Sequence, residues 1–253
     1  MIKNSIFFQA FFVLAILSTN LNAQDDSTSY VMHESLMVTP DNTKLALLGE
    51  NLRKHNIKFH NEGAFNASVF TISTGPNAGN MIWMMGPLTF KDLDSRPSGD
   101  AHDKDWRDNV MPYIKKFHTI EYWRLDAELS NMDDVDINVY PIVMVRYAEV
   151  NDEMDFLIKP FFTMVSKTIK AMEGDNPWGL YYNEFRQGDL GRHIASVGFL
   201  KNWSEMDEPG TFRKTFNETI GENEWQRFLR TEQNMLKNSW DEIWEYNKYL
   251  SGK

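Results

Sequence analysis

The chain has 253 residues, with 36 acidic and 26 basic side chains and a formal net charge of −10. This acidity argues against binding to nucleic acids or anionic membranes, because both need clustered Lys and Arg. The sequence contains no cysteine, which excludes disulfides, thiol catalysis and cysteine-ligated metals. In an exported protein, the lack of disulfides favours a bacterial source over a eukaryotic one.

The first 23 residues have the pattern of a signal peptide. Lys3 precedes a short apolar run over 6–17, and Ala23 offers a small residue for cleavage before Gln24. The alternative is an uncleaved N-terminal anchor, although the run is short for a membrane span. No later run is long enough, so we expect a periplasmic or secreted protein without a membrane span after cleavage.

The first half predicts a strand, a helix, a two-stranded hairpin, a second helix and a closing strand. The helix follows Asp41 as its cap, and the hairpin turns through Gly75–Gly79. Residues 91–105 are charged and predict a loop with room for one helical turn. The expected elements are strand 30–38, helix 42–55, strands 65–73 and 81–88, helix 104–117 and strand 120–129.

The same order returns after an acidic linker over 130–138. The second set comprises strand 140–150, a helix that begins after Asn151, strands 180–185 and 193–200, helix 222–240 and strand 243–250. Each set has the β-α-β-β-α-β order of a ferredoxin-like unit. We therefore predict an α+β fold of two ferredoxin-like units, over residues 24–130 and 131–253.

An internal repeat supports this division. Residues 70–94 and 182–207 share a strand, a glycine turn and a second strand with an internal glycine, at an offset of about 112 residues. That offset matches Gly86 with Gly198. The closing strands also look alike, with Glu121-Tyr122-Trp123 set against Trp244-Glu245-Tyr246.

Two such units in one chain resemble the dimeric α+β barrel superfamily. That superfamily includes antibiotic-biosynthesis-type monooxygenases, NIPSNAP-like and EthD-like proteins, and haem-dependent chlorite dismutases. The resemblance implies two sheets packed face to face with helices outside, here from one polypeptide that is a monomer or a homodimer. It also implies cofactor-independent oxygenation or haem chemistry, so the expected cofactor is either none or haem. Fold alone does not assign a function.

Two strand histidines, His33 and His193, are the candidate catalytic residues. Either imidazole could project between the sheets as a general base or an axial haem ligand, and the alternative is an ordinary hydrogen-bonded histidine. Arg124 and Arg146 lie in strands among apolar residues. They could clamp a ligand carboxylate or haem propionate, or they could form ion pairs, for example with Asp126 or Glu184.

Aromatic residues on the strands predict a site for a small, flat hydrophobic ligand. The candidate ligand-binding residues, with the two arginines, are Trp83, Trp123, Tyr182 and Trp244. Strand alternation places Tyr122, Arg124 and Asp126 on one face and Trp123 and Leu125 on the other. The alternative is that these aromatics form plain core.

No metal site is predicted. The segment Asp100–Asp105 holds His102 and three aspartates but lacks the EF-hand spacing, so we expect a solvated loop. We therefore expect an exported small-molecule-binding protein, either monooxygenase-like or haem-binding, with a pocket in each unit between sheet and helices. The alternative is a non-catalytic exported protein with a structural or interaction role.

Overall fold

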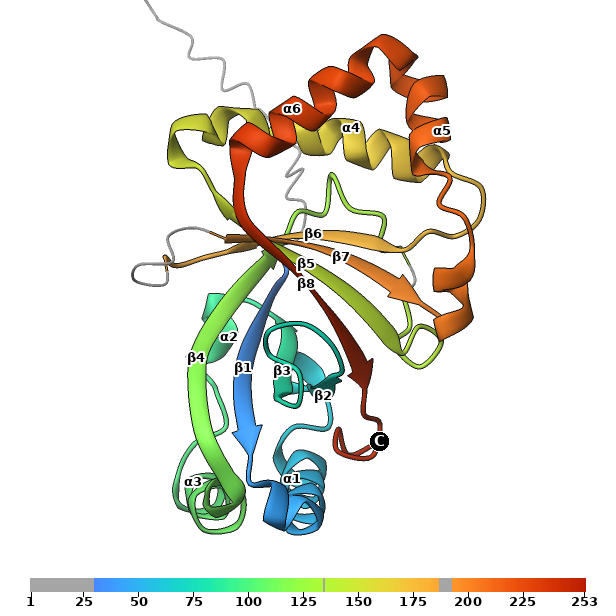
Figure 1. Cartoon of the computed structure of the whole chain (residues 1–253). Coiled ribbons are helices and arrows are strands. Elements are labelled where there is room, and N and C mark those ends of the chain that lie inside the picture. The colour runs from blue at the N-terminus through green and yellow to red at the C-terminus, as the bar shows by residue number, and fades with distance from the viewer. Residues whose placement is uncertain (1–29, 134, 187–192) are drawn as a thin grey trace, which may run out of the picture.

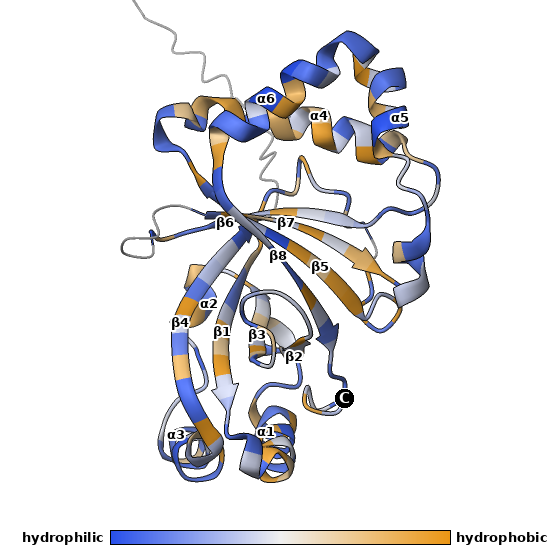
Figure 2. Ribbon diagram, viewed as in Figure 1, coloured by the Kyte–Doolittle hydropathy of each residue, from blue (hydrophilic) through white to orange (hydrophobic). Residues whose placement is uncertain are grey.

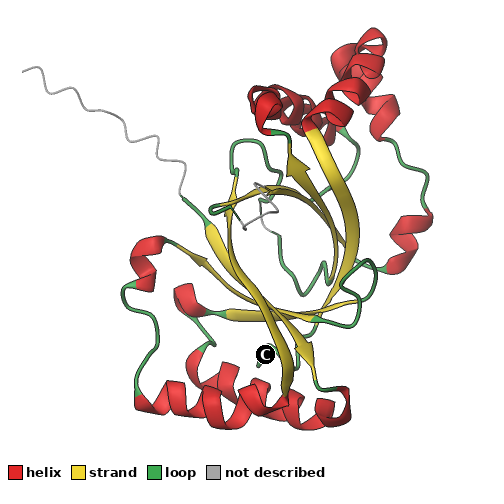
Figure 3. Ribbon diagram, turned by 60° about the vertical axis from the view of Figure 1, so that its left-hand side comes forward, coloured by secondary structure: helices red, strands yellow, loops and turns green. Residues whose placement is uncertain are grey.

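The structure is a computed structural model that describes residues 30–133, 135–186 and 193–253. Its eight strands close into one barrel in the order β1-β3-β2-β8-β5-β7-β6-β4 (Figure 1). Figure 3 shows these strands wrapped round a common interior, with helices outside the barrel. The predicted signal peptide, residues 1–23, lies outside the described residues.

The first unit builds half of the barrel. Its strands pair in the antiparallel order β2-β3-β1-β4. Helix α1 lies between β1 and β2, and two short helices lie between β3 and β4. The elements are β1 Met32–Pro40, α1 Leu45–Phe59, β2 Ala67–Ile72, β3 Met81–Leu88, α2 Phe90–Leu93, α3 Asp100–Asp105 and β4 Ile114–Leu125.

The second unit repeats this arrangement, with the strand order β6-β7-β5-β8. Its helices α4, α5 and α6 lie together over the outside of the sheet (Figure 1). The elements are β5 Ile142–Val150, α4 Ile158–Ala171, β6 Trp178–Asn183, β7 His193–Leu200, α5 Phe212–Phe216, α6 Trp225–Met235 and β8 Leu236–Tyr246. Two ferredoxin-like units in one chain therefore form the expected barrel.

Two seams join the units. At one, Trp123–Leu125 of β4 pair with Tyr181–Asn183 of β6. At the other, Phe70–Ile72 of β2 pair with Trp244–Tyr246 of β8. Both seams are much shorter than the ladders inside each unit; β5 and β7, for example, pair along their whole length.

Strand alternation produces three apolar layers. One layer lies between the first sheet and α1, and includes Leu36, Leu48 and Trp83. A second lies between the other sheet and α4 to α6. The third fills the barrel between the sheets, with Phe70, Val145 and Trp244. Because β5 contributes to two layers, it is mostly apolar on both faces, as its orange colour in Figure 2 shows.

Both closing strands begin earlier than predicted, and the helices before them are shorter. The predicted helix 104–117 gives way to β4 at Ile114, and the predicted helix 222–240 ends at Met235. In β8 the positive φ of Asn238, 45°, is incompatible with a continuing helix. Pairing of β8 with β5 overrides the local helical pattern. Part of the predicted loop 91–105 forms α2 and α3.

The 112-residue offset aligns the ends of the hairpin strands but not their faces. β3 and β7 have equivalent bounds at this offset. However, Gly86 lines the barrel interior, whereas Gly198 pairs with Met144 on the outer face. The match of these two glycines is therefore wrong by one position. Among the described residues, no helix is both long and apolar enough to cross a membrane.

Candidate functional site inside the barrel

The barrel interior holds two adjoining cavities. The polar chamber, of about 590 Å³, is lined by residues that include Glu121, Glu242, His193, Asn77 and Trp240. The apolar chamber, of about 320 Å³, is lined by residues that include His33, Phe70, Tyr181, Val197 and Trp244. Ser35, Trp123 and Tyr147 line both chambers, so the two meet at these side chains. Both volumes suit a small organic ligand.

A Glu-x-Trp pair on each closing strand dominates the chemistry of the interior. In β4 the indole of Trp123 donates to Glu121 Oε2 at 3.0 Å. In β8 the indole of Trp244 donates to Glu242 Oε2 at 2.8 Å. The side-chain period of two places each carboxylate and its indole on one face of the strand. Glu121-Tyr122-Trp123 thus corresponds to Glu242-Ile243-Trp244, not to the Trp244-Glu245-Tyr246 of the sequence comparison.

The Glu242 carboxylate is buried and accepts three hydrogen bonds. Besides Trp244, Asn77 Nδ2 donates to Oε1 at 2.7 Å and Trp240 Nε1 donates to the same oxygen at 3.2 Å. Asn77 comes from the β2–β3 hairpin of the other unit. These donors fix the position of Glu242 and satisfy a carboxylate that would otherwise be costly to bury.

Glu121 is held less tightly and is the more basic candidate. Burial raises the pKa of its carboxyl above the usual value, the Trp123 indole opposes this, and the negative charge of Glu242 adds to the rise. The same two carboxylates, after burial, raise the pKa of Tyr147 well above 10. A carboxylate pair facing a cavity, with one pKa raised, is the pattern of a general base.

Both predicted histidines project into the barrel, but into different chambers. His33 lines the apolar chamber, and its buried Nδ1 has no hydrogen-bond partner among the described residues. Burial lowers its pKa to about 4. His193 lines the polar chamber, where its ring lies edge-on to Trp240 at 5.9 Å between centroids. Burial lowers its pKa too. Both imidazoles are therefore neutral at pH 7.

Four other predicted residues lie outside the barrel. Arg124 forms an ion pair with Glu184 at 2.9 Å and stacks over Tyr182. Arg146 forms an ion pair with Asp241 at 2.8 Å on the exposed outer face. Trp83 faces α1, where its indole donates to Asn56. Of the six predicted ligand-binding residues, only Trp123 and Trp244 line the interior.

The chambers do not fit haem. Haem propionates need cationic partners, yet Lys116 is the one Lys or Arg among the described residues that line either chamber. Glu121 and Glu242 would repel the propionates instead. The predicted pockets between each sheet and its helices coincide with packed apolar layers. We therefore derive no chemistry through haem.

The two glutamates were missed at the sequence level. The pattern Glu-x-Trp occurs in both closing strands, but in the second copy Glu242 falls between the predicted helix 222–240 and the predicted strand 243–250. The misplaced start of β8 hid the alternation Trp240, Glu242, Trp244. A strand assignment from Leu236 would have placed these three side chains on one face.

Comparison with known proteins supports the fold. No protein-family model matches the chain, and no curated protein matches its sequence. Among solved structures, a candidate monooxygenase from Fusobacterium nucleatum aligns at 11% identity and a TM-score of 0.56, over 87% of this chain and 94% of that one. A candidate monooxygenase from Lactobacillus acidophilus aligns at 9% identity and a TM-score of 0.51, over 86% and 94%.

A candidate chlorite dismutase aligns at 8% identity and a TM-score of 0.52, over 88% of this chain and 98% of that one. At such identities the likeness concerns the fold alone. The strand order, the closed barrel and these neighbours agree with the expected resemblance. The chain thus has the fold of a dimeric α+β barrel, with both halves supplied by one polypeptide.

Proposed function

We propose that the chain binds a small, flat, mostly apolar molecule inside the barrel and removes a proton from it, as the first step of an oxygenase reaction without a bound cofactor. The observation that carries this proposal is the pair of carboxylates, Glu121 and Glu242, facing one cavity. They lie on the closing strands of the two units, and both raise the pKa of Tyr147, which lines the same chamber.

The apolar chamber determines the class of ligand. Trp123, Trp244, Phe70 and Tyr181 offer aromatic faces, and valines from β5 and β7 complete the wall. Such walls bind aromatic rings through apolar burial and offset ring contacts. A ligand there would extend past Trp123 and Tyr147 toward the polar chamber, where an acidic CH or OH group would meet Glu121.

The raised pKa of Glu121 supports a role as the base. A carboxylate with a raised pKa accepts a proton more readily than an ordinary one. Burial is the main cause of this rise, and the negative charge of Glu242, which three donors hold in place, adds to it. His193 and Tyr147 are among the other polar groups that line the polar chamber.

The oxygen chemistry is supported by the fold neighbours described as candidate monooxygenases. Loss of a proton from an activated CH₂ group leaves a carbanion that can reduce O₂. Overall, CH₂ and O₂ become C=O and H₂O, so the substrate supplies all the electrons and no reductant is needed.

The test uses anthrone, a flat molecule with an acidic CH₂ group, in an oxygen electrode. We expect catalysed uptake of one O₂ per anthrone, and a loss of at least about 100-fold in Glu121→Gln, the low end of the range for a general base. Glu50→Gln, an exposed change on α1, is the matched control. Binding of 1-naphthol, followed by tryptophan fluorescence, should survive in Glu121→Gln. Oxygen uptake no faster than in buffer alone, or an unchanged rate in Glu121→Gln, would contradict the oxygenase proposal.

The alternative, a non-catalytic exported protein, makes a different prediction. It requires that neither 1-naphthol nor anthrone quench the fluorescence of Trp123 and Trp244 in the interior. Export itself remains a proposal that the signal-like residues 1–23 support. Cell fractionation, with mass spectrometry of the N-terminus, tests it: cleavage before Gln24 is the expected result, and an intact N-terminus in the cytosol would contradict it.

A further inference from the structure

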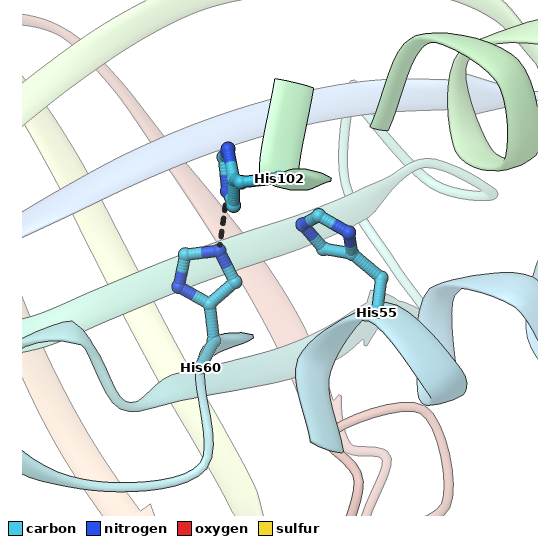
Figure 4. Close-up of side chains that lie close together, drawn as sticks. All are labelled: His55, His60 and His102. Carbon is cyan, nitrogen blue, oxygen red and sulfur yellow. Dashed lines mark hydrogen bonds between the residues drawn. The ribbon is translucent and has the colours of Figure 1, made fainter. Parts of the chain in front are cut away.

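Three histidines meet on the outside of the first unit, away from the barrel interior. His55 comes from α1, His60 follows the end of that helix, and His102 comes from α3 (Figure 4). Their ring centroids form a near-equilateral triangle with sides of 5.0, 5.2 and 5.3 Å. One nitrogen from each ring lies within 4.8 Å of the other two.

Hydrogen bonds fix which nitrogen of each ring faces the centre. His55 Nδ1 lies 2.8 Å from Asp105 Oδ2, and His102 Nδ1 lies 2.9 Å from Asp103 Oδ1. His60 Nδ1 lies 3.1 Å from the carbonyl oxygen of Phe65. All three partners can only accept, so each Nδ1 carries the proton and donates it. When all three rings are neutral, each Nε2 therefore keeps a free lone pair.

Without a cation this arrangement is unfavourable. Nε2 of His60 and Nε2 of His102 lie 3.2 Å apart, which sets two lone pairs against each other. Nε2 of His55 is buried and has no hydrogen-bond partner among the described residues. A buried acceptor without a donor costs free energy, and a cation between the three nitrogens would accept all three lone pairs at once.

We propose that Nε2 of His55, His60 and His102 bind one divalent transition-metal ion of the zinc class, with a fourth coordination position open to solvent. Two nitrogens bound tetrahedrally at about 2.0–2.1 Å would lie roughly 3.3 Å apart, close to the distance between His60 and His102. Three neutral imidazoles favour Zn²⁺, Cu²⁺ or Ni²⁺ over Ca²⁺ or Mg²⁺, which prefer oxygen. This site is independent of the proposed oxygenase function.

The surroundings match those of known metal sites. In each histidine the ring nitrogen that does not face the centre, Nδ1, donates its N–H to a carboxylate or a carbonyl. This is the outer-shell pattern that orients metal-bound histidines. His55 and His60 are buried, whereas the His102 side chain is 16% exposed and marks the solvent side.

A site of three histidines with an open position is the type that activates water or binds an anion. The same ion would link the end of α1 to α3, which belongs to the long excursion between β3 and β4. These histidines form no HExxH or similar motif, because His102 lies 42 residues beyond His60 and joins it only through the fold.

The experiment measures binding of Zn²⁺ alone to the chain, produced without a histidine tag, by calorimetry and by metal analysis after dialysis. We expect one Zn²⁺ per chain, lost in His55→Ala and in His102→Ala. The control His118→Ala also removes one histidine, but it should retain the ion. Asp105→Asn should weaken binding by roughly 10- to 100-fold through the outer shell. Co²⁺ should give a tetrahedral visible spectrum that changes when azide is added, because azide takes the open position.

Circular dichroism shows whether each variant folds. His102 is partly exposed, so His102→Ala decides the matter if the buried His55→Ala does not fold. Equal Zn²⁺ binding by the wild type and His102→Ala would overturn the site, and so would less than one ion per wild-type chain at saturating Zn²⁺. A Co²⁺ spectrum that does not change when azide is added would contradict the open coordination position.

Discussion

Replacing Glu242 by Gln tests the hydrogen-bond network that holds the interior carboxylate. The change keeps the shape of the side chain but turns one acceptor oxygen into an NH₂ donor. Oε1 accepts from Asn77 and Trp240, and Oε2 accepts from Trp244. Whichever way the amide is oriented, its NH₂ group faces at least one indole N–H, so at least one hydrogen bond to the carboxylate is lost.

The expected cost follows from that single lost bond. A hydrogen bond to a charged group contributes about 1.5–3 kcal/mol, and a buried unpaired donor costs a similar amount. Removal of a buried charge offsets part of this. We therefore expect Glu242→Gln to lower the free energy of unfolding by about 2 kcal/mol at pH 7, measured by urea denaturation with tryptophan fluorescence.

The control is Glu50→Gln, which removes an exposed carboxylate on α1 and should change stability by less than about 0.5 kcal/mol. Trp244→Phe is a second test of the same hydrogen bond, because it removes the indole donor instead of the carboxylate acceptor. In the Glu242→Gln background, Trp244→Phe should cost less than it does alone. A neutral or stabilising Glu242→Gln, together with additive double-variant energies, would refute the network.

Three further predictions concern other parts of the molecule. Because the folded-state pKa of Glu121 is raised, its contribution to stability is present at low pH and is lost as the pH rises through that pKa. In a series of urea denaturations from acidic to neutral pH, Glu121→Gln should therefore reduce the dependence of the unfolding free energy on pH. An unchanged dependence would contradict the burial of the carboxyl. Phe216→Ala should lower the free energy of unfolding by about 3–5 kcal/mol, because the ring is fully buried and its centroid lies 4.9 Å from that of Phe228. Thermal or urea denaturation measures this, and a loss below about 1 kcal/mol would mean that this helix layer is not closely packed. Arg146→Met should change stability by less than about 1 kcal/mol and leave 1-naphthol binding intact, because its ion pair with Asp241 is half-exposed outside the barrel; lost binding would place the arginine at the site after all.

The fold was predictable because element order depends on local patterns. Each unit shows its strands and helices in the periodicity of its apolar residues, and the strand-face assignment of Trp123 and Leu125 is confirmed by the chambers that they line. The limits of the closing strands were not predictable in this way. The sequence after Met235 reads equally well as helix, and only pairing with β5 decides for a strand.

The candidate sites depend on contacts between distant residues, which explains what was missed. Trp83 and Trp123 look alike in sequence, yet one faces a helix and the other faces the cavity, because β3 and β4 present different phases to the interior. Asn77 reaches Glu242 from the other unit, 165 positions away. His102 stood in a segment expected to be solvated, and only the path of that segment beside α1 brings it to His60.

The two short seams have a consequence for entry into the barrel. Because both units belong to one chain, the seams cannot be lost by dilution, so the interior stays assembled at any protein concentration. Yet each seam is held by few backbone hydrogen bonds, and local opening takes place where such bonds are fewest. Trp123 and Trp244 lie on these seam strands. The two lines along which the units pair over the fewest residues thus run beside the aromatic walls that a ligand has to reach.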